Sequence, residues 1–212
     1  FFAGRPLVIT RQVKQADAIL YAWHPGIEGG AALGELLFGA EAPSGHLPMT
    51  CLRTTGQAPF YYNHKNSGRP LTPNSWFKTR YLDTPTTPLF PFGYGLSYTR
   101  FEYANLQISG ALMRGKLEVS ADVTNIGKRA GTELVQLYVR DLVGSLTRPV
   151  RELKGFQRVS IDPGKTQRVS FILGEEQLAF TRADGSHGVE AGNFHVWIAA
   201  DSSGGLRGEF RI

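Results

Sequence analysis

The 212-residue sequence contains a single cysteine, Cys51, and this scarcity excludes an internal disulfide framework and a cysteine-based zinc site. No apolar run approaches the roughly 20 residues that a membrane-spanning helix needs. The basic excess is small and scattered, with 23 Lys and Arg against 18 Asp and Glu. Because nucleic-acid binding concentrates basic residues on one face or helix, we expect neither a nucleic-acid nor a membrane partner. Met49 and Leu52 beside Cys51 predict a buried, inert thiol.

Motifs of metal, nucleophile and phosphate chemistry are also missing. The five histidines stand singly, without the H-x-x-x-H spacing of a metal site. There is no G-x-S-x-G, and Gly26, Gly29 and Gly30 match neither G-x-G-x-x-G nor a P-loop. We therefore expect no cofactor and no metal. His195 lies in an alternating stretch, which predicts a residue on the face of a sheet.

Residues 1–52 have the pattern of an α/β fold. Pro6–Thr10 and Ala18–Trp23 are short continuous apolar runs, typical of strands buried on both faces, and the residues between them have room for only a turn or a helix fragment. Leucines at helical spacing predict a helix over about residues 29–38, which Gly39 ends.

Residues 53–100 are rich in proline, glycine and aromatic side chains. A long irregular connection is usually functional or disordered. Since disordered segments are poor in aromatics, this one is predicted to be an ordered linker that packs on a surface. Its aromatic residues are Phe60, Tyr61, Tyr62, Trp76, Phe77, Tyr81, Phe90, Phe92, Tyr94 and Tyr98.

Residues 101–212 are predicted to be all-β. Apolar and polar residues alternate over Lys116–Asn125, which is the period-two pattern of a strand buried on one face. Similar runs follow, separated by turn signals such as Asp162-Pro163-Gly164. About seven short strands in this length favour an immunoglobulin-like or fibronectin-like sandwich.

The corner Trp23–Gly30 is the candidate site, because α/β sheets bind ligands in the loops that lead from strands to helices. Glu28 could accept sugar hydroxyls and Trp23 could offer a stacking face. The structural alternative is that Glu28 caps the helix, the glycines permit a tight turn and Trp23 belongs to the core. The composition alone favours that alternative.

Acid–base hydrolysis of glycosides needs paired carboxylates. The carboxylates of the α/β part form no evident pair in the sequence; they are Asp17, Glu28, Glu35 and Glu41. An independent hydrolase that uses Glu28 and Asp17 is the least favoured of the open alternatives.

Five motifs in order resemble the C-terminal half of the family 3 glycoside hydrolases, and most of all their bacterial periplasmic β-glucosidases. The match extends over essentially the whole chain. The motifs are GRPLVI (4–9), ADAILYAWHPGIEGGAALGELLFGAEAPSGHLPMT (16–50), YYNHKNSGRP (61–70), PFGYGLSYTRFEY (91–103) and TRPVRELKGFQRV (147–159).

The resemblance implies a retaining enzyme that removes terminal β-linked sugars, mostly glucose. Such enzymes carry a (β/α)8 barrel, a Rossmann-like α/β sandwich and a fibronectin type III-like domain. Their nucleophile Asp and acid/base Glu precede the segment that begins at Phe1, so no catalytic residue is carried over. Trp23, His24 and Glu28 stay candidates for the rim of the sugar pocket or for a domain interface.

The resemblance therefore implies a segment that is inactive alone, from a periplasmic or secreted enzyme that acts on β-glucosides. It is expected to need the preceding barrel and α/β portion, and homo-oligomers are left open. Without that portion, an unpaired strand edge and an apolar helix face over residues 1–50 would be exposed. The alternative is a non-catalytic module that binds carbohydrate or protein through residues 101–212 and the linker.

Overall fold

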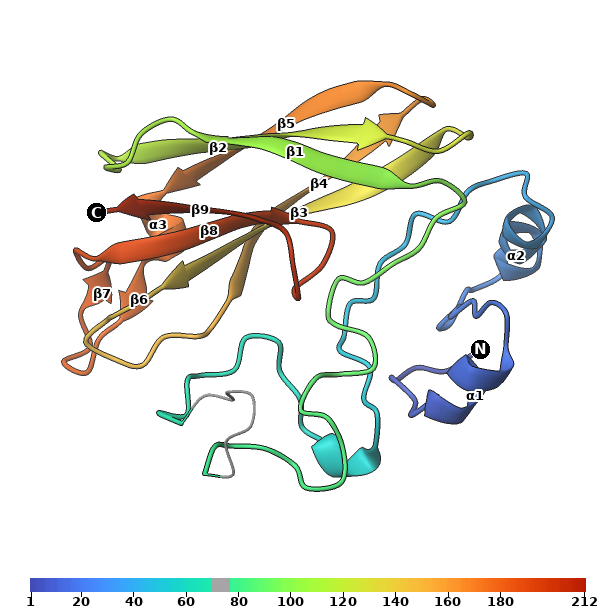
Figure 1. The fold of residues 1–212 in the computed structure, drawn as a ribbon, viewed down its shortest axis with the longest axis horizontal. Coiled ribbons are helices and arrows are strands. Elements are labelled where there is room, and N and C mark those ends of the chain that lie inside the picture. Colours follow the sequence, from blue (N-terminus) through green and yellow to red (C-terminus); the bar gives the residue numbers. More distant parts are fainter. Residues whose placement is uncertain (70–76) are drawn as a thin grey trace.

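The computed structural model describes residues 1–69 and 77–212. Two parts of different character follow one another, with short helices in the first hundred residues and strands after residue 100 (Figure 1). Residues 70–76, which include Pro70 and Trp76 of the sequence analysis, lie outside the described residues. Within the described residues, no helix is both long and apolar enough to cross a membrane.

The C-terminal part consists of two antiparallel sheets packed face to face. One sheet has three strands in the order β1-β2-β5, with bounds Phe101–Ile108, Lys116–Asn125 and Thr166–Gly174. The other has four in the order β4-β3-β8-β9, with bounds Glu152–Ile161, Gly131–Asp141, Asn193–Ala199 and Leu206–Arg211. At one end lie the short helix α3 (Glu175–Leu178) and a hairpin of β6 (Phe180–Thr181) and β7 (His187–Gly188) (Figure 1). The predicted β-sandwich is confirmed.

Strand β2 shows how the alternating pattern fixes this architecture. Leu117 is buried while Glu118 is exposed, so each side chain takes the face that its polarity favours. β2 pairs with β5 in unbroken antiparallel register along its length. In the predicted turn before β5, Gly164 has a φ of 70°, and its N–H donates to the Asn125 carbonyl oxygen over 2.8 Å.

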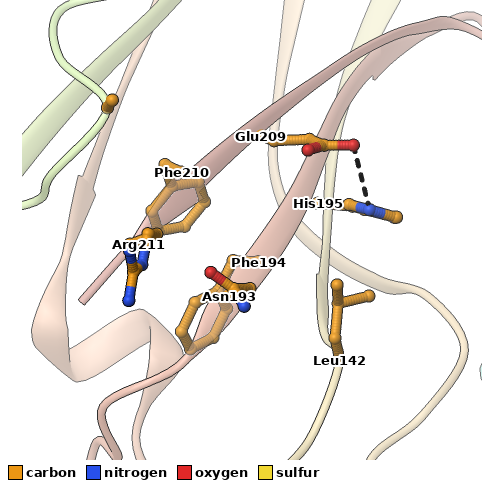
Figure 2. Close-up of a pocket in the computed structure, with 8 residues that line it drawn as sticks. Leu142, Asn193, Phe194, His195, Glu209, Phe210 and Arg211 are labelled. Atoms are coloured by element: carbon orange, nitrogen blue, oxygen red, sulfur yellow. Dashed lines mark ion pairs between the residues drawn. The ribbon is translucent and has the colours of Figure 1, made fainter.

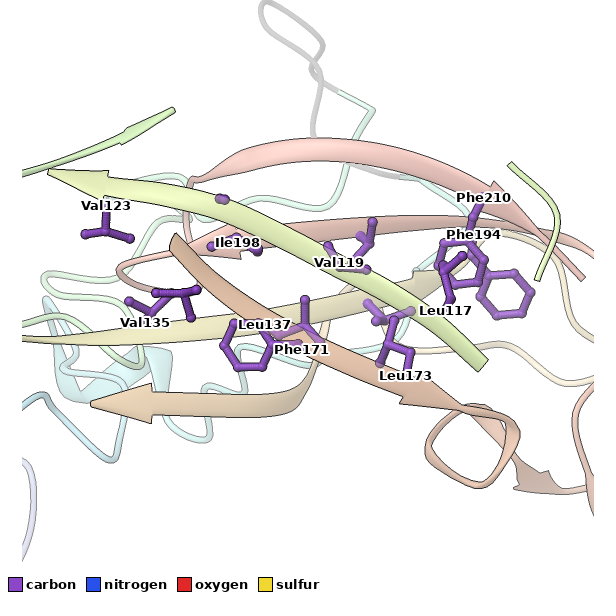
Figure 3. Packing of buried hydrophobic residues seen from close by; sticks show 14 of the residues in the cluster. Leu117, Val119, Val123, Val135, Leu137, Phe171, Leu173, Phe194, Ile198 and Phe210 are labelled. Atoms are coloured by element: carbon purple, nitrogen blue, oxygen red, sulfur yellow. The ribbon is translucent and has the colours of Figure 1, made fainter. Parts of the chain in front are cut away.

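Side chains of both sheets meet in one apolar core (Figure 3). Burying one Val, Leu or Phe side chain contributes about 1.5–3 kcal/mol, so packing alone can hold a sandwich that has no disulfide. The core residues labelled in Figure 3 are Leu117, Val119, Val123, Val135, Leu137, Phe171, Leu173, Phe194, Ile198 and Phe210.

The first part contains α1 (Thr10–Gln15) and α2 (Gly29–Leu37), which lie beside the sandwich rather than on its sheets (Figure 1). The helix fragment between the apolar runs and the longer helix are confirmed as α1 and α2. Gly39 ends α2 as predicted, with a φ of 77° and an N–H that donates to the Leu36 carbonyl oxygen over 3.2 Å.

The prediction of strands at Pro6–Thr10 and Ala18–Trp23 is wrong for the described structure. Neither segment is a strand, and a single parallel bridge joins Phe2 to Trp23. Parallel pairing becomes stable only in a sheet of several strands, and two short segments do not supply one. Thr10 instead begins α1.

The connecting residues 53–100 form one short 3-10 turn, Thr55–Gln57, and otherwise run as irregular chain in their described part. Tyr62 stacks on Phe92 with ring centroids 4.3 Å apart, and meets Tyr138 of β3 edge-on at 6.0 Å. Tyr62 and Phe92 therefore pack on the outer face of the four-stranded sheet.

Candidate functional site

The corner that precedes α2 is held by an aromatic cluster. Trp23 has a φ of 51°, a conformation that is uncommon for a bulky residue and costs about 1–2 kcal/mol. Its ring contacts that of Tyr21 with centroids 4.6 Å apart, and Tyr21 in turn stacks on Phe1 at 6.0 Å. The Tyr21 hydroxyl donates to the Arg5 carbonyl oxygen over 2.5 Å. Trp23 is thus half-buried, and its ring is held by the neighbouring aromatic rings.

His24 and Glu28 are both exposed on the same corner. The His24 ring lies against Gly4, where an added Cβ would overlap the ring. Glu28 occupies the N-cap position of α2, but its side chain accepts no capping hydrogen bond. Gly29 is buried against Pro25, so only glycine fits there. The structure brings the candidate residues onto one corner without joining their side chains by a hydrogen bond or ion pair among the described residues.

Several apolar side chains are exposed in the first 38 residues, beside the corner in the sequence and at the far end of α2. Phe38, directly after α2, is 92% exposed, and the others of this set are Phe1, Phe2, Val8, Ile27 and Leu37. Clustered exposed apolar residues mark interaction surfaces. The surroundings of Glu28 therefore favour an interface over a closed catalytic pocket, although the roles of Trp23, His24 and Glu28 stay predictions.

Cys51 is 1% exposed, and burial raises the pKa of its thiol. The predicted burial of Cys51 is confirmed, and its inertness stays a prediction that the raised pKa supports, because the thiolate is the nucleophile. Among the described residues, no group of three or more His, Cys, Asp or Glu side chains could hold a metal ion.

His195 is confirmed as a sheet-face residue of β8, where it lies in a shallow groove (Figure 2). Its Nε2 lies 3.3 Å from Oε1 of Glu209 on β9. Burial, with the nearby charges of Arg207 and Arg140 on the same face, lowers the pKa of His195. At neutral pH this imidazole is therefore neutral and able to donate and accept hydrogen bonds.

A buried carboxylate lies on the inner side of β3. Glu133 is almost fully buried and accepts a hydrogen bond from the Tyr103 hydroxyl over 2.8 Å. Burial raises the pKa of Glu133, and the same burial together with the Glu133 charge raises the pKa of Tyr103. The pair belongs to the interior of the sandwich, where Tyr103 packs against the apolar core.

Sequence reasoning missed an arginine clamp at the linker. The Arg151 guanidinium lies 4.1 Å from the ring centroid of Trp197, and its Nη1 donates to the carbonyl oxygens of Ser202 and Gly204 over 2.7 and 2.9 Å. The Ser202 N–H in turn donates to the Phe92 carbonyl oxygen over 2.9 Å. Arg151 stands in the motif TRPVRELKGFQRV. The contact joins residues from three distant segments, so no pattern along the chain indicates it.

Two family models match the chain. The Glycosyl hydrolase family 3 C-terminal domain matches residues 1–98, and the Fibronectin type III-like domain matches residues 133–202. The Periplasmic beta-glucosidase of Salmonella typhimurium is 43% identical over 99% of this chain. The chain corresponds to the C-terminal part of the family 3 glycosyl hydrolases. The resemblance seen in the sequence motifs is confirmed.

Other members of the family match over nearly the same length. A Beta-xylosidase of Formosa agariphila is 40% identical over 94% of this chain. The crystal structure of a beta-glucosidase from Listeria innocua in complex with isofagomine superposes with a TM-score of 0.95, at 37% identity over 99% of this chain. That of EmGH1, a b-glucosidase from Erythrobacter marinus, gives a TM-score of 0.90 at 40% identity over 99% of the chain.

The chain is short beside these family 3 proteins. It covers 28% of the Salmonella protein and 27% of the Formosa protein. It covers 30% of the Listeria chain and 27% of the Erythrobacter chain. The α/β corner with Trp23, His24 and Glu28 falls inside the region matched by the C-terminal domain model.

Proposed function

We propose that this chain forms the C-terminal segment of a retaining, exo-acting β-glucosidase that hydrolyses terminal β-D-glucosyl residues. The observation that carries the proposal is the superposition of 99% of the chain on the Listeria innocua beta-glucosidase with a TM-score of 0.95, while the chain covers only 30% of that protein. A fold retained at this level supports a common role for the matched segment. The described carboxylate Glu28 lies on an exposed corner, so we place the hydrolytic carboxylates on the remainder of the enzyme.

In this proposal the sandwich with the linker, and the corner at α2, have different roles. Its sandwich and linker form a rigid body, because Tyr62 and Phe92 pack against β3 and Arg151 fixes the adjoining loop. The apolar residues around α2, with Trp23, His24 and Glu28, form the rim of the sugar pocket or the contact with the barrel portion. By resemblance to the periplasmic beta-glucosidase of Salmonella, we propose a periplasmic or secreted location.

The test is a chimera in which this chain replaces the matching C-terminal segment of the Salmonella periplasmic beta-glucosidase. We expect the chimera to hydrolyse an aryl β-D-glucoside within about tenfold of the parent rate, a loss of no more than about 1.4 kcal/mol in transition-state stabilisation. The 212-residue chain alone is expected to show no turnover. A chimera that melts cooperatively but lacks activity would overturn the proposal.

Matched substitutions in the chimera test the corner. Glu28→Gln is expected to raise KM, since Glu28 lies on the proposed rim, while Glu35→Gln on exposed α2 surface serves as the control with the same charge change. Turnover by the chain alone that disappears in Glu28→Gln would mean that the corner itself is catalytic. Glycan binding by the chain, without activity of the chimera, would favour a non-catalytic binding module.

A further inference from the structure

We propose that the groove on the outer face of β8 and β9 binds the carboxylate-bearing unit of an acidic saccharide. The groove has a volume of about 380 Å³, which suits one or two sugar rings. Its lining residues include Asn193, His195, Glu209 and Arg211, and Figure 2 shows these side chains around the hollow. The proposal goes beyond the hydrolytic role, because it concerns a ligand held by the sandwich.

Strand register brings the four polar side chains together. Asn193 lies opposite Arg211, and His195 lies opposite Glu209, on the same face of the antiparallel pair. Residues directly opposite have Cβ atoms about 4.5–5.5 Å apart, and diagonal neighbours about 7–8 Å, so one ligand unit can contact all four. The rings of Phe194 and Phe210, each 2% exposed, point into the core and stack at 5.1 Å, which gives the groove a rigid base.

Positive charge exceeds negative charge on this face. Glu209 already has two partners, the His195 Nε2 at 3.3 Å and the Arg207 Nη2 at 3.4 Å. Arg211 and Arg140, the β3 neighbour of His195, form no ion pair among the described residues. A guanidinium binds a carboxylate through two parallel hydrogen bonds, so the free arginines favour an anionic ligand.

The neutral groups favour a bound unit that carries several hydroxyl groups and a single carboxylate. The Asn193 amide and the neutral His195 ring each offer a donor and an acceptor, and the Glu209 carboxylate accepts from hydroxyl groups. Glu209 lies beside Arg211 in the groove, so it repels a multiply charged anion such as phosphate more strongly than a single carboxylate. A hexuronate unit, with one carboxylate and several hydroxyls, fits this set.

The test is calorimetric titration of the full chain with trigalacturonate, with cellotriose as the neutral comparison and phosphate and acetate as simple anions. We expect trigalacturonate to bind at least about tenfold more tightly than cellotriose, as loss of one charge-assisted hydrogen bond predicts. Arg211→Gln is expected to weaken trigalacturonate binding about tenfold, while Arg11→Gln in α1 leaves it unchanged. Asn193→Ala provides a second variant if Arg211→Gln melts at a lower temperature.

Three results would overturn the proposal. The first is trigalacturonate binding no tighter than that of cellotriose. The second is displacement by phosphate or acetate at concentrations equal to trigalacturonate, which would show a simple anion site. The third is unchanged affinity in both groove variants when each is folded. None of these readouts depends on glycosidase activity, so this proposal and the hydrolytic one can fail separately.

Discussion

Asn125 at the end of β2 holds three segments of the sandwich together, and its replacement should be costly. The side chain is fully buried (0% exposed), and its Oδ1 accepts from the Thr99 hydroxyl and the Gly127 N–H over 2.5 and 3.0 Å. Its Nδ2 donates to the carbonyl oxygens of Arg129 and Ile161 over 2.7 and 2.8 Å. All four hydrogen-bonding positions of the amide are therefore used.

Asn125→Ala removes the hydrogen-bond partner of two donors, the Thr99 hydroxyl and the Gly127 N–H, and of two acceptors, the carbonyl oxygens of Arg129 and Ile161. Each buried unpaired group costs about 1–3 kcal/mol, and the bonds to Gly127 and Arg129 are only partly buried, so water can compensate there. Counting mainly the buried bonds to Thr99 and Ile161, we expect a loss of about 3–5 kcal/mol in the free energy of unfolding. That is a large share of the 5–15 kcal/mol typical of a domain.

Urea denaturation of the chain, followed by tryptophan fluorescence, measures this loss. Gln107→Ala on the exposed face of β1 is the control and should change the free energy by less than about 0.5 kcal/mol. Thr99→Val should cost about 1–2 kcal/mol and should be non-additive with Asn125→Ala, since both remove the same hydrogen bond. A loss below about 1 kcal/mol for Asn125→Ala would refute the reasoning.

Three further predictions concern the linker contact and the buried carboxylate. Arg151→Met should lower the free energy of unfolding by about 2–3 kcal/mol, because the contact with Trp197 and two hydrogen bonds are lost; an unchanged urea midpoint would contradict this. Gly93→Ala should cost more than about 2 kcal/mol, since Gly93 has a φ of 81° and its Cβ would overlap the Gln136 amide; a melting temperature equal to wild type would exclude that strain. Burial raises the pKa of Glu133, so the folded state holds this proton more tightly than the unfolded chain. The stabilisation that it gives is complete below the unfolded pKa and is lost as the pH rises toward the folded pKa. Glu133→Gln should therefore flatten the pH dependence of stability above about pH 4, and a slope equal to wild type would show that Glu133 does not titrate in this way.

The sandwich could be predicted from the sequence because the residue pattern that indicates each strand lies within that strand. In β2 the apolar side chains at every second position, such as Leu117, Val119 and Val123, enter the core, so period two in Lys116–Asn125 identifies the strand without knowledge of its partners. Turn residues carry the same kind of information, as Gly164 shows by its positive φ. Family membership was also readable, because five motifs keep their order along the chain.

The structure of the α/β part was predicted less accurately from the sequence. Pro6–Thr10 and Ala18–Trp23 have the apolar content of buried strands, but a strand exists only when neighbouring strands pair with it. In the described structure one bridge at Trp23 takes the place of a ladder. The helix α2 was predictable because its hydrogen bonds lie within the segment itself.

The sequence by itself determined the β-sandwich, the α2 helix, the buried Cys51 and the family, since periodicity, turn residues and motif order are local properties of the chain. Tertiary structure alone decided the contacts between distant segments. Arg151 meets Trp197 and the loop at Ser202, and strand register places Arg211 beside Asn193. Such contacts depend on how strands pair and how sheets pack. The spacing of residues along one strand does not indicate which strand will pair with it.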